Sequence, residues 1–361
     1  MKKLRLAALM LALMLLAAML PSCKKSIKEP EGHDLTSWSV TKEPTYKKKG
    51  VLTRSCKEEG CSFSQSVKVK CAKGLSYERD LDGKLYVTGK GSFDGEFLYI
   101  ADETPKGEPI SGIAEEAFFD DLDIRYAYIE DGIEMLYDYT FTGCENLLEV
   151  RLPEGCDFTG VGHFLSCRAL KRINLPEGMT ELPMQFFDGC ESLAHIDLPV
   201  SLETVGYSAF NLCVALTEIT LPEGLKRIES EAFSACYNLE EIVFPEGLET
   251  IMDSAFVGCS SLKEIVLPEG LLELRELAFA HCSRLERVYI PQSVQGIYVN
   301  MGFSPFNYCN KNLKLITNAE ERQQGWSEFF NVYYTGLSET SDPVDGYEYL
   351  EVLYGQKIPK N

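Results

Sequence analysis

Histidine and tryptophan are scarce in this chain, which has four His and two Trp among 361 residues. The HExxH, GxSxG and phosphate-loop spacings are all missing, so the common zinc-hydrolase, serine-hydrolase and nucleotide-binding chemistries have no candidate residues. Gly89-Lys90-Gly91 is an isolated GxG in a region where we expect a hairpin. We therefore predict that the chain is not an enzyme and uses no cofactor, and we assign no catalytic residue and no metal site.

Positively charged residues are also few compared with negatively charged ones. Lys and Arg together number 35 against 55 Asp and Glu, which gives a formal net charge of -20 at pH 7. Because nucleic-acid phosphates need clustered Lys and Arg, this acidity argues against nucleic acid as a partner. It argues equally against attachment to anionic lipid through protein charge alone. The simplest explanation is that an acidic surface keeps the protein soluble.

No apolar segment reaches the ~20 residues that a membrane-spanning helix needs. The longest run has 15 residues, from Leu6 to Leu20, and it follows the positively charged Lys2, Lys3 and Arg5. A positive start followed by a short apolar run is typical of a signal peptide rather than a membrane anchor.

The residues at the end of this run, Leu20-Pro21-Ser22-Cys23, resemble a bacterial lipobox. An apolar residue lies three positions before the Cys and a small residue directly before it, although Pro21 is unusual at its position. The resemblance implies cleavage before Cys23 and acylation of its thiol, and two or more acyl chains hold a protein stably on a bilayer. We expect a lipoprotein signal peptide over residues 1–22, then a lipidated Cys and linker over 23–50. The alternative is a plain secretory peptide with an incidental Cys.

Three columns of residues repeat with a period of 23. The columns consist of Cys144, Cys167, Cys190, Cys213, Cys236, Cys259 and Cys282; of Pro153, Pro176, Pro199, Pro222, Pro245, Pro268 and Pro291; and of Phe118, Phe141, Phe164, Phe187, Phe210, Phe233, Phe256 and Phe279. An eighth Cys, Cys309, follows after 27 residues, with Phe306 three positions before it. Three columns with one period indicate a repeat architecture, and 23 residues falls within the range of leucine-rich repeats.

Residues 216–233, with the sequence LTEITLPEGLKRIESEAF, show one regular unit. Leu216, Ile219 and Leu221 alternate with other residues, which predicts a short strand with these three side chains facing inward. Pro222 ends the strand because it lacks the N–H that a parallel ladder needs.

The second half of the unit returns to the core through Leu225 and Ile228, and Glu231-Ala232-Phe233 predicts one short helical turn. No single unit covers its own apolar side, whereas stacked units bury a continuous core. We therefore predict an α/β fold, a leucine-rich-repeat solenoid of about eight 23-residue units over residues 107–316, with a parallel β-sheet on one face.

The unit pattern AFxGCxxLxxIxLPEGLxxI resembles the BspA-like leucine-rich repeats of bacterial surface proteins. Phe141-Thr142-Gly143-Cys144 and Leu152-Pro153-Glu154-Gly155 carry this pattern. The likeness covers roughly residues 107–316 and weakens at both ends, as capping units should. The resemblance implies a surface-exposed adhesin or binding protein.

The flanks of the repeats differ from the repeats themselves. Residues 51–106 are predicted to form a small β module and N-terminal cap, in which a strand at 85–88 follows a hairpin turn and 97–100 is its expected partner. Residues 317–361 are predicted to form a C-terminal cap and tail. Within them, Gly325-Trp326-Ser327 resembles the terminal unit of the same proteins, where a Trp closes the core.

The cysteines fall into two groups. Those of the repeating column predict a ladder of buried thiols, because parallel side-chain vectors oppose disulfide geometry. For Cys56, Cys61 and Cys71, outside the repeats, three states stay open. Cys56 and Cys61 could form a disulfide in an exported module, all three could be free thiols, or the three together with His33 could ligate zinc. The four-residue gap and the single His argue against zinc.

Outward-facing strand positions are the best candidates for a binding site. We predict that the site lies on the concave face and includes Glu218, Glu241, Glu264, Val243, Val266, Arg287 and Tyr289. The three Glu would stack as like charges at strand spacing, which costs stability. The two Val and the Tyr are apolar where solvent is expected. A basic partner surface with an apolar spot would relieve both.

The sequence therefore predicts a lipid-anchored surface protein that mediates protein binding or adhesion to host or neighbouring cells. Its expected partner is a protein, such as a host matrix or cell-surface protein, and its expected contact with the membrane is through the lipid. The expected location is the cell envelope, at the outer membrane and exposed at the surface. The alternative is a periplasmic or cell-envelope scaffold with no adhesive role. Because repeat proteins change partners by changing exposed residues on one scaffold, the identity of the ligand depends on the outward side chains of the repeats.

Overall fold

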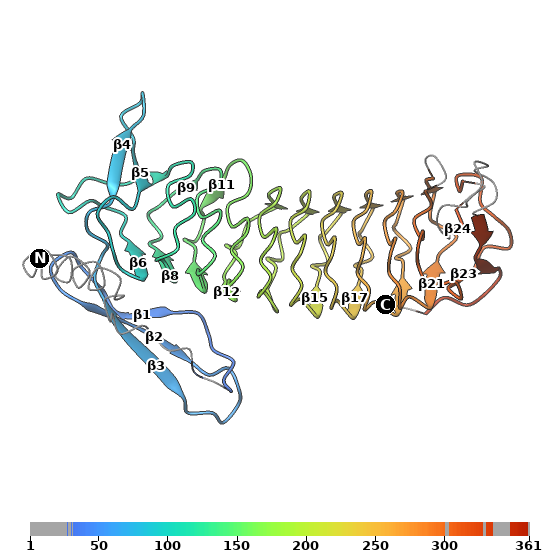
Figure 1. Ribbon diagram of the computed structural model, residues 1–361. Helices are drawn as coiled ribbons and strands as arrows, with labels where there is room; N and C mark the ends of the chain where they lie inside the picture. Colours follow the sequence, from blue (N-terminus) through green and yellow to red (C-terminus); the bar gives the residue numbers. More distant parts are fainter. Residues whose placement is uncertain are drawn as a thin grey trace, which may run out of the picture.

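The computed structural model describes residues 27, 30, 32–299, 303–327, 330–334 and 347–359. Figure 1 shows a long row of stacked chain turns with an antiparallel β-sheet projecting near its N-terminal end. The predicted signal peptide and Cys23 lie outside the described residues.

A ladder of parallel strands runs along one side of the row, and we call the surface formed by its outward side chains the strand face. Its strands are β6 (Phe97–Ile100), β8 (Tyr126–Ile129), β10 (Glu149–Arg151), β12 (Arg172–Ile173), β15 (Glu218–Thr220), β17 (Glu241–Val243), β19 (Glu264–Val266), β21 (Arg287–Ile290), β23 (Lys314–Thr317) and β26 (Glu351–Leu353). In the regular units, paired residues are 23 apart, as Glu241 is from Glu218. The predicted period therefore sets the register of the ladder.

The return half of each turn adds a second parallel ladder, which the repeat pattern alone did not predict. Its strands are β5 (Leu85–Gly89), β7 (Gly112–Ile113), β9 (Met135–Leu136), β11 (Asp157–Phe158), β13 (Glu181–Leu182), β14 (Thr204–Val205), β16 (Arg227–Ile228), β18 (Thr250–Ile251), β20 (Glu273–Leu274) and β22 (Gly296–Ile297). The ladder is interrupted between β11 and β13. Gly160 and Gly162 lie in this irregular stretch, and both have positive φ.

The expected pairing of residues 97–100 with the strand at 85–88 is wrong. β6 pairs in parallel with β8, while β5 pairs in parallel with β7 and antiparallel with β4 (Ser76–Arg79). The segment between β5 and β6 crosses from one ladder to the other, so these two strands begin opposite sides of the solenoid. Within the described residues the stack has about ten turns rather than about eight, because the end turns lack the repeating Cys and Pro.

The described residues contain no helix, and the helical turn predicted at Glu231-Ala232-Phe233 is absent. Each regular unit instead places two residues, four apart, at positive φ, such as Glu231 at 57° and Ala235 at 56°. The N–H of Phe233 donates to the carbonyl oxygen of Ala255 in the next turn, 2.7 Å away. A helix would use such N–H groups for bonds within its own segment. Because they point along the stack, this segment forms a third set of bonds between turns.

The core is continuous from turn to turn, and its register is the predicted one. Ile219, Ile242 and Ile265 are buried in a single column. Beside them the Phe column forms a stack of rings, in which the ring centroid of Phe233 is 5.1 Å from that of Phe210 and 5.1 Å from that of Phe256. Each unit therefore completes the packing of its two neighbours.

The predicted ladder of buried thiols is confirmed. Cysteines of the column are free and buried, and the Sγ of Cys236 donates to the carbonyl oxygen of Phe210 in the preceding turn at 3.1 Å. Burial raises the pKa of the Cys236 thiol to about 12. A thiol with so high a pKa stays protonated near pH 7, and the thiolate is the reactive form of cysteine. These cysteines are therefore structural rather than reactive.

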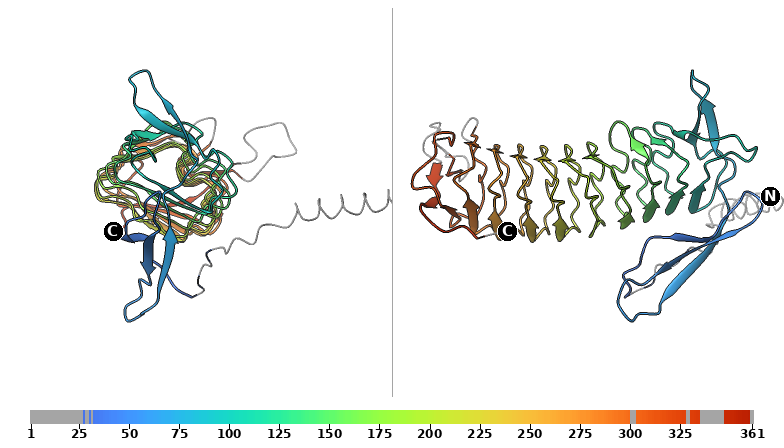
Figure 2. Two further views of the ribbon diagram at one scale, coloured as in Figure 1. Left: turned by 90° about the vertical axis from the view of Figure 1, so that its left-hand side faces the viewer. Right: turned by 180° about the vertical axis from the view of Figure 1, so that it is seen from behind.

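Smaller elements lie at the two ends of the stack. The N-terminal sheet has the order β1 (Ser39–Lys42), β2 (Gly50–Ser55), β3 (Ser64–Val69), and the C-terminal end includes the antiparallel pair β24 (Val332–Tyr334) and β25 (Tyr347–Tyr349). Trp326 is buried there and donates its Nε1–H to the carbonyl oxygen of Val294 at 2.8 Å. It closes the core as expected. Viewed along the solenoid axis, the N-terminal sheet and the β4–β5 hairpin project on opposite sides (Figure 2).

Candidate functional site

The N-terminal sheet covers the beginning of the strand face. A second hydrophobic cluster joins the two, and it consists of Trp38, Leu52, Val69, Cys71, Tyr99, Ala101, Tyr126, Tyr128 and Leu148. Strand alternation places Tyr126 and Tyr128 in solvent, yet they are only 0% and 9% exposed. The signal for this contact was present in the sequence, since two aromatic residues occupy outward positions of one strand.

An ion-pair network also joins the N-terminal sheet to the strand face. Glu149 of β10 is 1% exposed, and its Oε2 lies 2.9 Å from Nη1 of Arg54 in β2 and 3.0 Å from Nε of Arg172 in β12. Its Oε1 accepts a hydrogen bond from the backbone N–H of Trp38 at 2.8 Å. The Arg54 guanidinium also lies over the Trp38 ring, 4.3 Å from its centroid. Buried charges are tolerated when they are paired and hydrogen-bonded in this way.

Beyond β12 the strand face is open to solvent. Figure 1 shows the turns stacked along a nearly straight axis, so we call the predicted surface the strand face rather than the concave face. Glu218 and Glu241 lie directly opposite each other on β15 and β17, and neither forms an ion pair with another described residue. Glu264 differs because its Oε2 is 2.6 Å from Nε of Arg287 on β21. The expected stack of three uncompensated carboxylates is therefore reduced to two.

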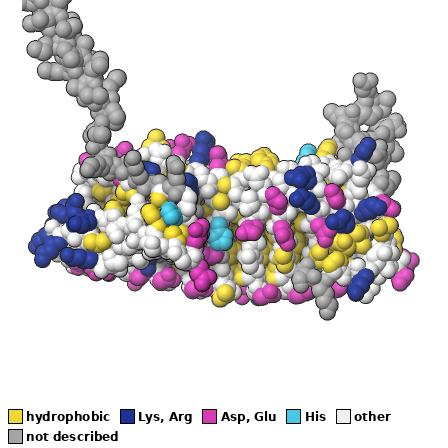
Figure 3. Space-filling model, turned by 90° about the horizontal axis from the view of Figure 1, so that it is seen from below, with side chains coloured by type: hydrophobic (Ala, Val, Ile, Leu, Met, Phe, Trp, Pro, Cys, Tyr) yellow, Lys and Arg dark blue, Asp and Glu magenta, His cyan; other side chains and the backbone are white. Residues whose placement is uncertain are grey.

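Apolar side chains accompany the two carboxylates. Val243 is 52% exposed, while Val266 and Tyr289 are half-buried and lie opposite each other in the ladder. A surface hollow of about 360 Å³ next to Val243 is lined by Ile219, Thr220, Leu221, Glu223, Val243, Phe244, Pro245 and Glu246. Figure 3 shows this face from below, with stripes of hydrophobic side chains between rows of Asp and Glu.

A second hollow, of about 450 Å³, continues the first one along the stack. It is lined by Glu246, Val266, Leu267, Pro268, Glu269, Asn318, Lys357, Ile358 and Pro359. The last three of these residues belong to the C-terminal tail, which therefore borders the strand face. The open part of the face lies between this tail and the N-terminal sheet.

The histidines come from separate parts of the fold. His163 is buried in the core, and burial lowers its pKa to about 4, so it is neutral at pH 7. His195 is exposed and its Nε2 lies 3.1 Å from Oδ1 of Asp197. His281 is also exposed, and His33 belongs to the segment that precedes β1.

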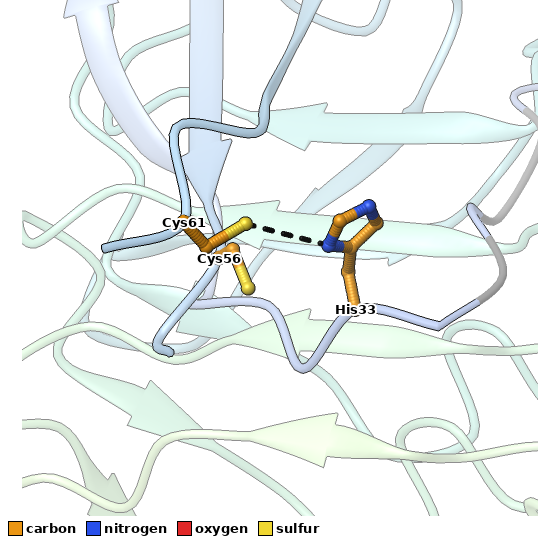
Figure 4. A group of neighbouring side chains, drawn as sticks. All are labelled: His33, Cys56 and Cys61. Atoms are coloured by element: carbon orange, nitrogen blue, oxygen red, sulfur yellow. Dashed lines mark hydrogen bonds between the residues drawn. The ribbon is translucent and has the colours of Figure 1, made fainter. Parts of the chain in front are cut away.

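The cysteines of the N-terminal sheet are divided between two places. Cys71 is buried in the contact with the solenoid, so the four-residue zinc set that would include it is not assembled. His33, Cys56 and Cys61 do come together, with one donor atom from each lying within 4.8 Å of the others (Figure 4). Both of these cysteines are free thiols. Within the described residues, no helix is both long and apolar enough to cross a membrane.

Comparison with known proteins gives one family match. A family model described as BspA type leucine rich repeat region (6 copies) matches residues 111–240 and 180–314. No curated protein matches the chain.

Solved structures of three bacterial proteins are similar to this chain. A leucine-rich repeat protein of T. pallidum is 26% identical, with 59% of this chain and 89% of that chain covered and a TM-score of 0.43. One from Bacteroides ovatus is 24% identical, with 68% and 70% covered and a TM-score of 0.47. The pneumococcal vaccine antigen PcpA is 16% identical, with 90% and 100% covered and a TM-score of 0.35.

Proposed function

The chain belongs to the BspA-type leucine-rich-repeat family, and we propose that it is a lipid-anchored surface protein that binds a protein partner through the open part of its strand face. The partner is a host matrix or cell-surface protein, and binding serves adhesion to host or neighbouring cells. The chain acts by recognition and not by catalysis.

The observation that carries this proposal is the pair of facing carboxylates beside exposed apolar surface. Like charges opposite each other across a strand pair lower stability, and Glu218 and Glu241 have this arrangement without an ion-pair partner in the described part of the chain. Val243, next to them, is an apolar side chain at a solvent-exposed position, where a polar residue is more favourable. A partner that brings a cation and an apolar side chain would offset both costs.

The shape of the open face limits the partner further. From β15 to β21 there are three strand spacings, roughly 14 Å in all. Glu223, Glu246 and Glu269 line the two hollows on this stretch. The face therefore suits a protein segment in which Lys or Arg side chains flank one or two apolar residues.

Reversing the two facing charges is expected to weaken binding. The double variant Glu218→Lys/Glu241→Lys should attach about tenfold more weakly to immobilised extracellular-matrix extract, equivalent to about 1.4 kcal/mol. The loss should be larger at low ionic strength, because salt screens exposed charges over about 8 Å at physiological concentration. Attachment is measured at both ionic strengths, and circular dichroism checks the fold. Glu264 is left unchanged because it pairs with Arg287.

The matched control is Glu181→Lys/Glu249→Lys. These two carboxylates are exposed on or beside β13 and β18, in the second ladder, so the control changes net charge by the same amount on another side of the solenoid. The control should attach like the unmodified chain. If the control loses attachment and the strand-face variant keeps it, the proposed site is wrong.

Lipid anchoring is a separate part of the proposal, since Cys23 lies outside the described residues. It rests on the 15-residue apolar run that ends in Leu20-Pro21-Ser22-Cys23. We expect Cys23→Ala to abolish labelling by a palmitate analogue and to block lipoprotein-type cleavage in the producing cell. Cys71→Ala is the control and should be labelled normally. Normal labelling of the Cys23 variant would show that the thiol is not the acylated group.

A further inference from the structure

The turn between β2 and β3 holds two cysteines in fixed positions. Cys56 follows β2, and its N–H donates to the carbonyl oxygen of Phe63 at 3.0 Å. Cys61 comes after the intervening turn, and its N–H donates to the carbonyl oxygen of Glu58 at 3.1 Å. Both cysteines are partly buried as whole residues.

The third donor comes from the segment that precedes β1. Leu35 forms an antiparallel bridge with Cys56, and this bridge holds the segment along the end of β2. The ring of His33 stacks on Phe63 with a centroid separation of 4.2 Å and an interplanar angle of 14°. Its Nδ1 lies 3.6 Å from the Sγ of Cys61, and Figure 4 shows these two atoms pointing toward each other.

We propose that His33, Cys56 and Cys61 bind a zinc-class divalent cation. Two thiolates and one imidazole form the soft nitrogen and sulfur set that zinc prefers. The four-residue gap between the cysteines argued against zinc in the sequence, but it lies at the upper limit of the spacing in structural zinc sites, and the fold brings both thiols and the imidazole together. A tetrahedral zinc with bonds of roughly 2.0–2.3 Å holds its donors roughly 3.5 Å apart. The His33–Cys61 separation already has this value, and the remaining separations, within 4.8 Å, need about 1 Å of side-chain movement.

Charge around the group also favours a cation. Binding releases the two thiol protons to solvent, so that two thiolates neutralise the 2+ ion while the imidazole stays neutral. Glu58 and Glu59 add two carboxylates in the turn between the cysteines, while Asp34 is paired with Lys57, whose Nζ lies 3.7 Å from its Oδ2. Three protein donors leave a fourth position for water or for a donor from a partner.

A disulfide between Cys56 and Cys61 is the competing state. It would consume both thiols and would give no role to the imidazole nitrogen that faces Cys61. The cation uses all three donors and ties the segment leading to the N-terminus onto the sheet. That sheet is already held to the solenoid by Arg54 and Glu149.

Cobalt substitution tests the site. The full chain is purified with a non-thiol reductant, freed of metal with a chelator and titrated with Co²⁺, and then with Zn²⁺ in competition. We expect one cobalt ion per chain, with the absorption that arises from thiolate-to-cobalt charge transfer, and displacement of cobalt by zinc. Cys56→Ser/Cys61→Ser should lose this absorption. His33→Phe keeps a ring to stack on Phe63 and removes one of the three donors. It should weaken cobalt binding by at least about tenfold, since even loss of an outer-shell partner of a metal ligand costs about 10–100-fold.

The control is Cys71→Ala, which removes a thiol of the same sheet outside the group and should leave the cobalt spectrum unchanged. Circular dichroism confirms that each variant is folded. The proposal fails if His33→Phe binds cobalt as tightly as the unmodified chain. It also fails if the cysteine double variant keeps the absorption, or if the reduced, folded chain shows none.

Discussion

Replacing Glu149 with Ala is expected to lower the free energy of unfolding by about 3–5 kcal/mol, the cost of removing one partner from a buried ion pair. The side chain of Arg54 is 0% exposed, so its guanidinium would remain buried without its carboxylate. The backbone N–H of Trp38 would lose its acceptor at the same time. Both losses fall on the contact between the N-terminal sheet and the solenoid.

Tryptophan fluorescence can measure this loss of stability, because the two tryptophans lie at opposite ends of the molecule. Trp38 lies in the contact and Trp326 closes the C-terminal core, so urea unfolding followed by fluorescence in a Trp326→Phe background reports the N-terminal contact. We expect the transition seen by Trp38 to move to lower urea in the Glu149→Ala variant. A second variant, Arg54→Met/Glu149→Leu, removes both charges and should recover the part of the stability that is lost through the buried Arg54 charge, but not the part lost through the Trp38 N–H and Arg172.

The control for this prediction is Glu203→Ala, which breaks an exposed pair with Lys226. Their Nζ and Oε2 atoms are 2.7 Å apart, but both side chains are about half exposed. Exposed pairs contribute roughly 0–1 kcal/mol. Equal losses in Glu149→Ala and Glu203→Ala would mean that the buried network does not hold the sheet in place.

Replacing Phe233 with Ala should also cost about 3–5 kcal/mol, as for other buried aromatic residues. Phe233 is fully buried between the rings of Phe210 and Phe256, so the substitution opens a cavity and removes contacts on both sides. Denaturant unfolding followed by circular dichroism measures the loss.

Tyr237→Ala is a matched aromatic truncation in the same unit. Tyr237 is 47% exposed, and surface substitutions of this kind usually change stability by less than about 0.5 kcal/mol. A loss for Tyr237→Ala as large as that for Phe233→Ala would contradict the assignment of the Phe column as the centre of the core.

The period in the sequence was enough to predict the stack and its register. A 23-residue repeat of Phe, Cys and Pro fixes which residues share a column, and the buried Ile219, Ile242 and Ile265 follow from strand alternation. The same reasoning correctly placed Glu218 opposite Glu241. These inferences succeed because each depends on spacing alone, and neighbouring turns share the same spacing.

Contacts between distant segments could not be read in this way. Arg54 meets Glu149 across 95 residues of sequence, and no local pattern connects the two. The left-handed turns were missed for a different reason. Gly143, Gly189 and Leu212 occupy equivalent positions of different repeats, and all three have positive φ. Glycine adopts positive φ readily and leucine rarely does, so the residue types at this position did not predict a left-handed turn.

The 23-residue register of the ladders has a consequence for how this surface can evolve. Because equivalent residues pair from turn to turn, duplication or loss of one whole unit in the middle of the row leaves every other strand pair and ring stack in phase. Each added unit lengthens the open strand face by about 4.8 Å. The N-terminal sheet and the C-terminal tail would keep their own contacts at the two ends. The area of the strand face that is open to a partner can therefore increase or decrease by one strand spacing at a time, without changes to the N-terminal sheet or the C-terminal tail.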